Sequence, residues 1–306
     1  MTSSAESMPA TLPPGIQVFD RRSVRRNRDR AAPGFAAHAF LFEEVAARLA
    51  DRLDDVRREF RAILDLGARG GVMARALAAR GGAPFVVHVD LSERLVRGLP
   101  RAVVADAEAL PFAGGFDLAL SCLDLHWVND LPGALVQIRR ALRPDGLFLA
   151  AFLGGDTLAE LREAWLAAEI EVEGGAGPRV SPFADGRDAG ALLQRAGFAL
   201  PVVDTDRITV TYADPIGLMR DLRGMGEANA VALRRRGGTR RATLLRAAEI
   251  YAERFAGPEG RVRATFEVVT LTGWAPHAAQ QRPLQPGSAA MRLADALAAD
   301  TPPARG

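Results

Sequence analysis

Short apolar segments alternate with amphipathic segments through the first half of the chain, and this alternation restricts the fold more than any other feature. The apolar segments carry few polar residues, so we expect strands that are buried on both faces. Such strands form parallel sheets, and right-handed crossovers place helices on both faces. The chain is therefore predicted to form a doubly wound, Rossmann-like α/β fold. The expected strands are residues 62–67, 85–90, 101–106, 116–122 and 147–153; the expected helices between them are 72–79, 92–99 and 131–142, with a turn at 143–146.

The second half of the chain has a different pattern. Residues 202–212 and 262–274 alternate in polarity, which is typical of antiparallel strands. Paired at one edge of the same sheet, they make it seven-stranded and mostly parallel, with an antiparallel last strand. The helical segments between them predict an inserted helical lid over residues 213–258. A long helix is expected from residue 156, with Asp156 as its N-cap.

The predicted domain covers residues 16–276, and residues 16–55 form an N-terminal helical cap. Leu41, Val45, Leu49 and Leu53 make one apolar helical stripe within that cap. Residues 1–15 read as a disordered leader without the features of a secretory or mitochondrial signal, so we expect a cytoplasmic protein. Residues 277–306 are expected to be a flexible tail.

Composition excludes several kinds of chemistry. All 39 basic residues are arginine, so a lysine Schiff base and a P-loop lysine are both excluded. Cys122 is the single cysteine and the four histidines are scattered, so no metal site is expected. The net charge of +2 with a pI near 9.2 reflects the absence of lysine, and we expect no nucleic-acid partner.

A glycine-rich turn follows the first expected strand in the sequence "AILDLGARGGVMARAL". Gly67 and Gly71 flank the turn and let the backbone approach a ligand. Asp90 ends the second strand, where a carboxylate can accept hydrogen bonds from both ribose hydroxyls of a nucleotide-like cofactor, and this pair of signals fits NAD equally well. Asp106 follows the third strand and can accept from an adenine amine. Arg69 stands where such loops usually carry glycine; we expect it to face solvent, with a contact to a cofactor carboxylate as the alternative.

These strand-end residues resemble the motifs of class I S-adenosylmethionine-dependent methyltransferases, and they occur in that family's order over residues 63–274. "LRPDGLFLA" before and within the fifth strand also matches. The resemblance implies S-adenosyl-L-methionine as cofactor. The expected cofactor-binding residues are Asp65, Gly67, Gly71, Asp90, Leu91, Asp106, Ala107 and Ser121.

A longer resemblance, over residues 16–288, is to a narrower group. It rests on "FDRRSVRRNRDRAA", "LHWVNDLPGALVQIRRALRPDGLF", "GGDTLAELR", "VSPF", "LMRDLRGMGEAN" and "LTGW". The chain resembles the methyltransferase-like complex I assembly factors, whose mitochondrial member is a protein arginine hydroxylase, and their bacterial counterparts. The resemblance implies a protein substrate, such as a complex I subunit, and arginine hydroxylation or methylation.

Two alternatives stay open. A more distant resemblance is to the carboxyl methyltransferases of malonyl-acyl-carrier protein. A non-catalytic assembly chaperone is the other reading, because Arg69 could block the cofactor loop. Methyl transfer needs mainly alignment of the nucleophile, whereas hydroxylation needs an oxygen-activating centre, for which the sequence shows no metal triad.

Candidate residues beyond the loop are few. His126 follows the fourth strand and is the candidate catalytic base or polarising group, with packing as the equal alternative. Asp124 is expected to be solvated, with a substrate contact as the alternative. The arginines of residues 20–30 are expected in part to cover the cofactor. The basic cluster at 233–241 reads as a solvated loop, with an acidic partner or a peripheral membrane contact as the alternative. Candidate pocket aromatics are Phe152, Trp165 and Phe183, which at these spacings are more often core residues.

Overall fold

The computed structural model describes residues 17–81, 84–182 and 186–281. The chain divides into a large unit, Met1–Pro276, and a small one, His277–Gly306; all the helices and strands described lie in the large unit. The strands are β1 Ala62–Leu66, β2 Phe85–Asp90, β3 Ala102–Val104, β4 Phe116–Cys122, β5 Leu142–Leu153, β6 Ala199–Tyr212 and β7 Val262–Trp274. The helices are α1 Arg21–Ala31, α2 Phe40–Arg52, α3 Val72–Ala79, α4 Glu93–Val96, α5 Leu131–Ala141, α6 Ala159–Glu173, α7 Gly186–Arg195, α8 Pro215–Gly224 and α9 Arg241–Phe255, with 3₁₀ turns η1 Ala32–His38 and η2 Leu125–Trp127. The predicted leader and most of the predicted tail lie outside the described residues.

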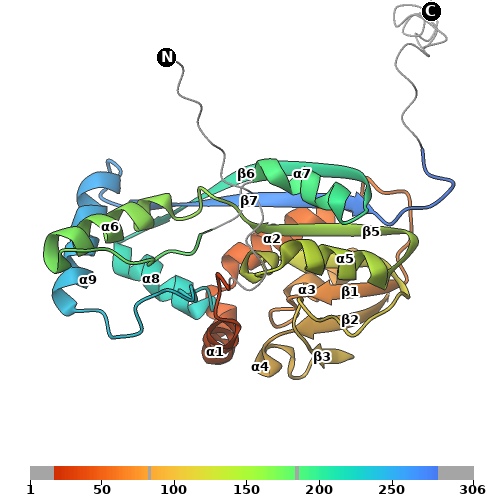
Figure 1. The fold of residues 1–306 in the computed structure, drawn as a ribbon, viewed down its shortest axis with the longest axis horizontal. Coiled ribbons are helices and arrows are strands. Elements are labelled where there is room, and N and C mark those ends of the chain that lie inside the picture. The colour runs from red at the N-terminus through yellow and green to blue at the C-terminus, as the bar shows by residue number, and fades with distance from the viewer. Residues whose placement is uncertain (1–16, 82–83, 183–185, 282–306) are drawn as a thin grey trace, which may run out of the picture. The chain divides into compact units, whose positions relative to one another are not determined.

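The strands form one seven-stranded sheet in the order β3-β2-β1-β4-β5-β7-β6 (Figure 1). The first five strands pair in parallel, and β7 pairs antiparallel with both β5 and β6. This arrangement confirms the predicted doubly wound fold. The order reverses between β1 and β4, which is the place where such sheets bind ligands.

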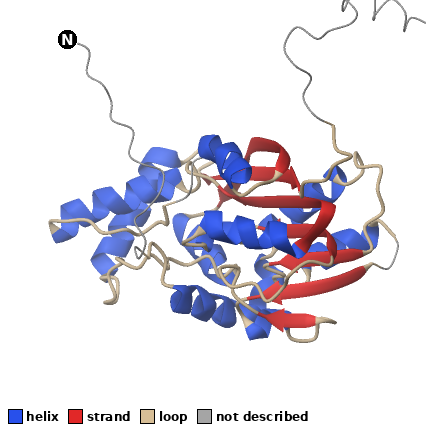
Figure 2. Ribbon diagram, turned by 45° about the vertical axis from the view of Figure 1, so that its right-hand side comes forward, coloured by secondary structure: helices blue, strands red, loops and turns tan. Residues whose placement is uncertain are grey.

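Helices cover both faces of the sheet, as Figure 2 shows. Side chains of β4 alternate between the two resulting cores: Leu118 and Leu120 pack with α2 and α3 on one face, and Ala119 packs with α5 on the other. Every residue of β4 is buried, because a central parallel strand has no solvent-facing side.

The elements outside the sheet gather at the carboxyl ends of the parallel strands. There α1 lies beside α8, and α8 and α6 both lie against α9 (Figure 1). A bridge from Phe19 to Val231 ties the segment before α1 to the loop after α8.

The expected stripe on α2 is confirmed, since Leu41, Val45 and Leu49 are all buried. Among the described residues, none of the helices has the length and apolar character that crossing a bilayer requires.

Two local predictions were wrong. The N-cap of α6 is Leu158, which makes no side-chain hydrogen bond to the helix; the carboxylate of Asp156 instead pairs with Arg207 at the surface. The expected turn at residues 143–146 lies within β5, where Asp145 has a positive φ of 63° and the strand continues. Backbone hydrogen bonds of Asp145 and Gly146 with Ala275 hold this bend beside the end of β7.

These cap assignments give a paired prediction. The Asp214 side chain accepts from the Gly217 amide at 2.8 Å and caps α8, so Asp214→Ala should lower the free energy of unfolding by about 1 kcal/mol. Asp156→Ala removes only an exposed ion pair and should cost less than about 0.5 kcal/mol. Urea denaturation of both variants checks this, and an equal loss in the two would contradict the cap assignment.

Candidate functional site

The glycine-rich turn after β1 is held against the end of β2. The amides of Gly67 and Ala68 both donate to the Val89 carbonyl, at 2.8 and 3.0 Å. Gly67 and Gly71 have φ of 72° and 78°, a conformation that glycine adopts most readily. A Cβ on Gly67 would lie 2.4 Å from Cβ of Asp124, so the loop and the end of β4 are in close contact through glycine.

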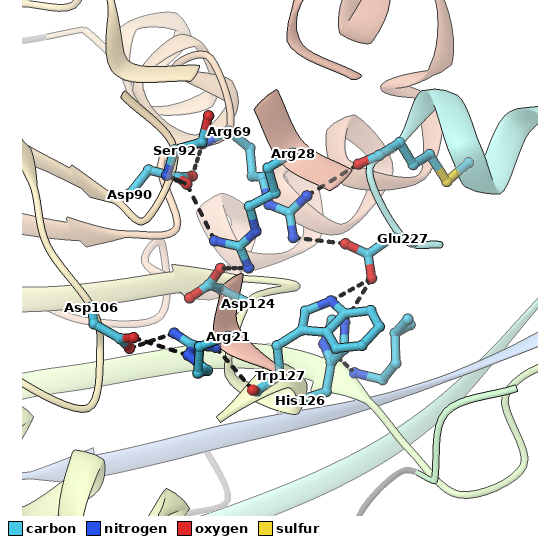
Figure 3. A network of polar contacts seen from close by, with 12 residues as sticks. Arg21, Arg28, Arg69, Asp90, Ser92, Asp106, Asp124, His126, Trp127 and Glu227 are labelled. Atoms are coloured by element: carbon cyan, nitrogen blue, oxygen red, sulfur yellow. Dashed lines mark hydrogen bonds and ion pairs between the residues drawn. The ribbon is translucent and has the colours of Figure 1, made fainter. Parts of the chain in front are cut away.

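Asp90, at the end of β2, accepts three hydrogen bonds from the protein (Figure 3). Its donors are the Ser92 amide at 2.8 Å, the Arg69 amide at 3.2 Å and Nη1 of Arg28 at 3.2 Å. The carboxylate predicted to bind ribose is thus present at the strand end, and an arginine of α1 is bound to it.

Arg28 lies between Asp90 and Asp124 and is only 1 % exposed. Burial would lower the pKa of its guanidinium, but the charges of Asp124 and Asp90 outweigh burial and raise it. Asp124 is also buried, and although burial would raise its pKa, Arg28 and Arg69 lower it. The expectation that Asp124 is solvated was wrong, because its carboxylate partners the buried arginine.

Arg69 is buried as well, with 1 % of its surface exposed. Nη2 donates to Oε1 of Glu227 at 2.6 Å and Nη1 to the Met225 carbonyl at 3.1 Å. The guanidinium also lies over the Phe42 ring, 4.9 Å from its centroid. The prediction that Arg69 faces solvent was wrong: its side chain joins the cofactor loop to the segment after α8.

Glu227 connects the loop after α8 to the end of β4. Its Oε2 accepts from Nε1 of Trp127 at 2.7 Å and lies 2.9 Å from Nε2 of His126. Nδ1 of His126 lies 3.5 Å from the Leu153 amide nitrogen, which donates to it. Burial would raise the pKa of Glu227, but Arg69 and His126 bring it down to about 2.

A second arginine of α1 holds the carboxylate after β3. Nε of Arg21 donates to Asp106 at 2.9 Å, Nη2 pairs with the same carboxylate, and Nη1 donates to the Trp127 carbonyl at 2.9 Å. Asp106 also accepts from the Glu108 amide at 3.0 Å. Arginines of the N-terminal segment therefore bind both Asp90 and Asp106; that some of them cover the cofactor stays a prediction.

The other predicted cofactor residues lie around this network. Oδ2 of Asp65 is 2.9 Å from Nδ1 of His88, and burial raises the pKa of that carboxyl. Ser121 is fully buried on β4, and Ala107 packs in the core beside α5. Leu91 packs against Trp127 and the start of α1.

Several buried polar atoms of this region make no hydrogen bond within the described part of the chain: Nε of Arg28, Nε of Arg69, Oδ1 of Asp65 and Oγ of Ser121. Burying such atoms without partners is costly. Two donors from arginine and one carboxylate acceptor match a ligand that carries both a carboxylate and an ammonium group, as the methionyl end of S-adenosylmethionine does. The residues therefore fit this cofactor, provided that Arg28 and Arg21 release part of Asp90 and Asp106 to its ribose and adenine.

A cavity of about 230 Å³ adjoins the network. Its walls are mostly aliphatic and aromatic, and Glu227, Arg179, Arg223, Ser181 and Asn229 are its polar members. Trp165, one of the candidate pocket aromatics, lines the cavity and also packs in the core; Phe152 lies in the core, and Phe183 lies outside the described residues. His126 is not among the lining residues, so its catalytic role stays a prediction, and the structure shows it as a partner of Glu227.

The sequence analysis missed Glu227 and did not single out Arg28. A signal for Arg28 exists, because Val24, Arg28 and Ala31 follow the helical spacing of one buried face. Glu227 follows Gly226 in a loop and has no periodic pattern, but it lies within the stretch "LMRDLRGMGEAN" that carries the family resemblance. Among the residues that the structure describes, no group of three or more His, Cys, Asp or Glu side chains could hold a metal ion.

Comparisons with known proteins found a matching domain model and similar sequences. Residues 64–150 match the model of a methyltransferase domain. The chain is 43 % identical to the mitochondrial arginine-hydroxylase NDUFAF5 of Danio rerio, over 92 % of this chain and 90 % of that protein, and 42 % identical to the protein of the same name from Homo sapiens, over 96 % and 88 %. It is 40 % identical to a malonyl-[acyl-carrier protein] O-methyltransferase of Halorhodospira halophila, over 88 % and 93 %.

Solved structures show the same fold. Phosphoethanolamine N-methyltransferase 2 of Haemonchus contortus, in complex with S-adenosyl-L-methionine, superposes with a TM-score of 0.52 at 17 % identity, over 87 % of this chain and 62 % of that one. The YcgJ protein of Bacillus subtilis superposes with a TM-score of 0.50 at 16 % identity, over 75 % and 98 %.

The ionisation of Glu227 predicts a pH effect on stability. Its pKa falls from 4.5 to about 2 on folding, so the ionised carboxylate contributes fully above pH 4.5, by about 3 kcal/mol. Between pH 4.5 and 2 the unfolded state binds one more proton, and the contribution falls by about 1.4 kcal/mol per pH unit. Glu227→Gln should therefore be less stable than the native protein at pH 7, and the difference should shrink towards pH 3.

Urea denaturation at pH 7, 4 and 3 measures this difference. Glu259→Gln changes an exposed carboxylate and serves as the control, with little expected effect at any pH. A pH-independent difference for Glu227→Gln would show that its carboxylate is not the ionised partner of Arg69.

Proposed function

The chain belongs to the family of methyltransferase-fold proteins that includes the NDUFAF5 arginine-hydroxylases, and on this premise we propose that it is an S-adenosylmethionine-binding enzyme that modifies an arginine side chain of a protein during respiratory complex I assembly. Hydroxylation is the favoured modification, since it is the one that these relatives' names state. It would take one oxygen atom from dioxygen and release the other as water, so it also requires an external two-electron reductant. Methylation of the same side chain is the second possibility.

One observation carries the proposal: the likeness to these relatives covers nearly the whole chain. A match over 96 % of 306 residues leaves room for only short unmatched ends, so it extends beyond residues 64–150 into α1 and the segment after α8. These two elements supply Arg28 and Glu227. The likeness therefore spans the segments that carry these two residues as well as the common domain, which supports the proposal.

The chain's own groups would hold the cofactor at the strand ends. Asp90 would accept from the ribose and Asp106 from the adenine, while Arg28 and Arg69 would donate to the methionyl carboxylate. When bound, S-adenosylmethionine supplies an electrophilic methyl group or, where its methyl is not transferred, a charged wall of the site. Trp127 and the apolar cavity walls would exclude water, and Glu227 would keep His126 and Trp127 in place.

A second candidate function is O-methylation of a carrier-bound carboxylate. It is favoured by the relative from Halorhodospira halophila and by Arg223, an exposed arginine in the cavity wall for which the described residues supply no ion pair. A guanidinium there suits a carboxylate of the substrate.

The cytoplasmic location rests on the sequence, and we retain it as part of the proposal.

Calorimetric titration with S-adenosylmethionine tests cofactor binding. The native protein should bind, and Asp90→Asn should weaken binding by about tenfold, or 1.4 kcal/mol, because it removes a charged acceptor. Asp51→Asn, a change of an exposed carboxylate on α2, is the matched control and should bind normally. No binding by the native protein would reject both enzymatic functions and leave a chaperone.

Mass spectrometry tests the reaction. Complex I subunits from cells with and without the gene should differ by the mass of one oxygen atom on one arginine if the chain is a hydroxylase, and by a methylene group if it methylates. Subunits of equal mass, together with methyl-ester formation on purified malonyl-acyl-carrier protein, would establish the second candidate function instead.

A further inference from the structure

A second hollow of about 480 Å³ lies on the surface beside the cavity. Its walls come from the segment before α1, from α6, from the loop after α6 and from the loop after α8. Most lining side chains are apolar, and two of them are prominent: Leu233 is 86 % exposed and Leu166 is 50 % exposed. Large apolar side chains so exposed around a hollow are characteristic of an interaction site.

This surface hollow shares a wall with the cavity. Trp165, Arg179 and Val180 line both of them. The Arg179 guanidinium lies over the Trp165 ring, 5.0 Å from its centroid, and is held by an ion pair with Glu169. A ligand in the hollow is therefore separated from the interior cavity by one layer of side chains.

The charged side chains that the described residues contribute to the wall of the hollow are both arginines, Arg162 and Arg179. Arg162, in its wall, donates to the backbone carbonyls of Gly155 and Thr157, and no carboxylate of the described residues pairs with it. Arg236 is exposed three residues beyond Leu233, whereas the neighbouring Arg235 is neutralised by Glu173. The hollow therefore combines apolar contacts with an excess of cations, which suits an acidic partner.

We propose that this hollow docks the segment of the substrate protein that flanks the target residue. The segment is an extended chain with an apolar side chain that packs against Leu166 and Leu233, and with acidic residues that face Arg162 and Arg236. Its neighbouring target side chain enters the cavity past Trp165 and Arg179. This inference rests on the proposed function for its substrate class, and on the shared wall and the charge for its location.

A defined peptide tests the docking directly. The probe is a fluorescent peptide of about 12 residues, roughly 40 Å when extended, with one central arginine, two leucines and three aspartates. We expect it to bind the full-length protein in fluorescence anisotropy. Leu166→Asp/Leu233→Asp should weaken binding by about tenfold or more, since both changes put a repelling charge on the apolar contact.

Two controls match these changes. Leu245→Asp alters a leucine on α9 that is 47 % exposed, close to the exposure of Leu166. This variant should bind the peptide with an affinity within about twofold of that of the native protein. A peptide with lysines in place of the aspartates should bind about tenfold more weakly than the acidic one. The proposal would be overturned if the double variant bound the acidic peptide as tightly as the native protein does, or if the native protein bound the lysine peptide as tightly as the acidic one. It would also be overturned if the native protein did not bind the acidic peptide.

The same variants separate this inference from the proposed function. In cells that lack the gene, the native protein and Leu245→Asp should restore arginine modification of complex I subunits, while the double variant should restore much less. Its affinity for S-adenosylmethionine should be unchanged, because neither leucine touches the strand-end network. If the native protein restores nothing, the proposed function fails and the peptide data still decide the docking. If the double variant restores modification fully, the docking is wrong and the function stands.

Discussion

The buried ion pairs of Arg28 with Asp90 and Asp124 are the interaction on which the organisation of this site depends. A guanidinium that is 1 % exposed loses its hydration, and only close carboxylates and hydrogen bonds offset that loss. Here the two carboxylates come from the ends of β2 and β4, on either side of the point where the strand order reverses. Helix α1 is therefore fixed over the ligand-binding end of the sheet by charge as well as by apolar packing.

The pairing of Arg69 with Glu227 extends this network across the site. Arg69 belongs to the loop that would hold the cofactor, whereas Glu227 lines the cavity that would hold the substrate. The bridge between Phe19 and Val231 and the bond from Asn27 to the Ala228 carbonyl tie α1 to the same segment. A displacement of the cofactor loop would therefore move Glu227 in the cavity wall through its ion pair with Arg69. A displacement of the segment after α8 would in turn move α1 through these backbone and side-chain contacts.

The sequence predicted the parts of the molecule that local pattern determines. The strands up to β4, α3 and the β6–β7 pair follow from apolar periodicity, and the parallel topology then places Asp65, Asp90 and Asp106 at one edge. Arg69 was misjudged because its partner is 158 residues away in the chain, and no local pattern reports a contact over that separation. Asp124 was misjudged for a related reason: a lone aspartate after a strand is usually solvated, and its burial depends on an arginine from a different element.

Both carboxylate oxygens of Glu227 already accept hydrogen bonds from the protein. An arginine substrate could therefore bind this carboxylate only by displacing one of the donors. Of the described residues that line the cavity, Glu227 alone is a carboxylate, and its oxygens already accept from Arg69 and Trp127 while facing His126. A guanidinium that reached this carboxylate would have to replace that of Arg69, and it would find the same partners: the Met225 carbonyl and the Phe42 ring. Such an exchange would give Glu227 and the Met225 carbonyl a new donor, and its cost would lie in separating the Arg69 guanidinium from these partners. Arg69, which stands where such loops usually carry glycine, thus marks a place in the structure whose partners suit a guanidinium.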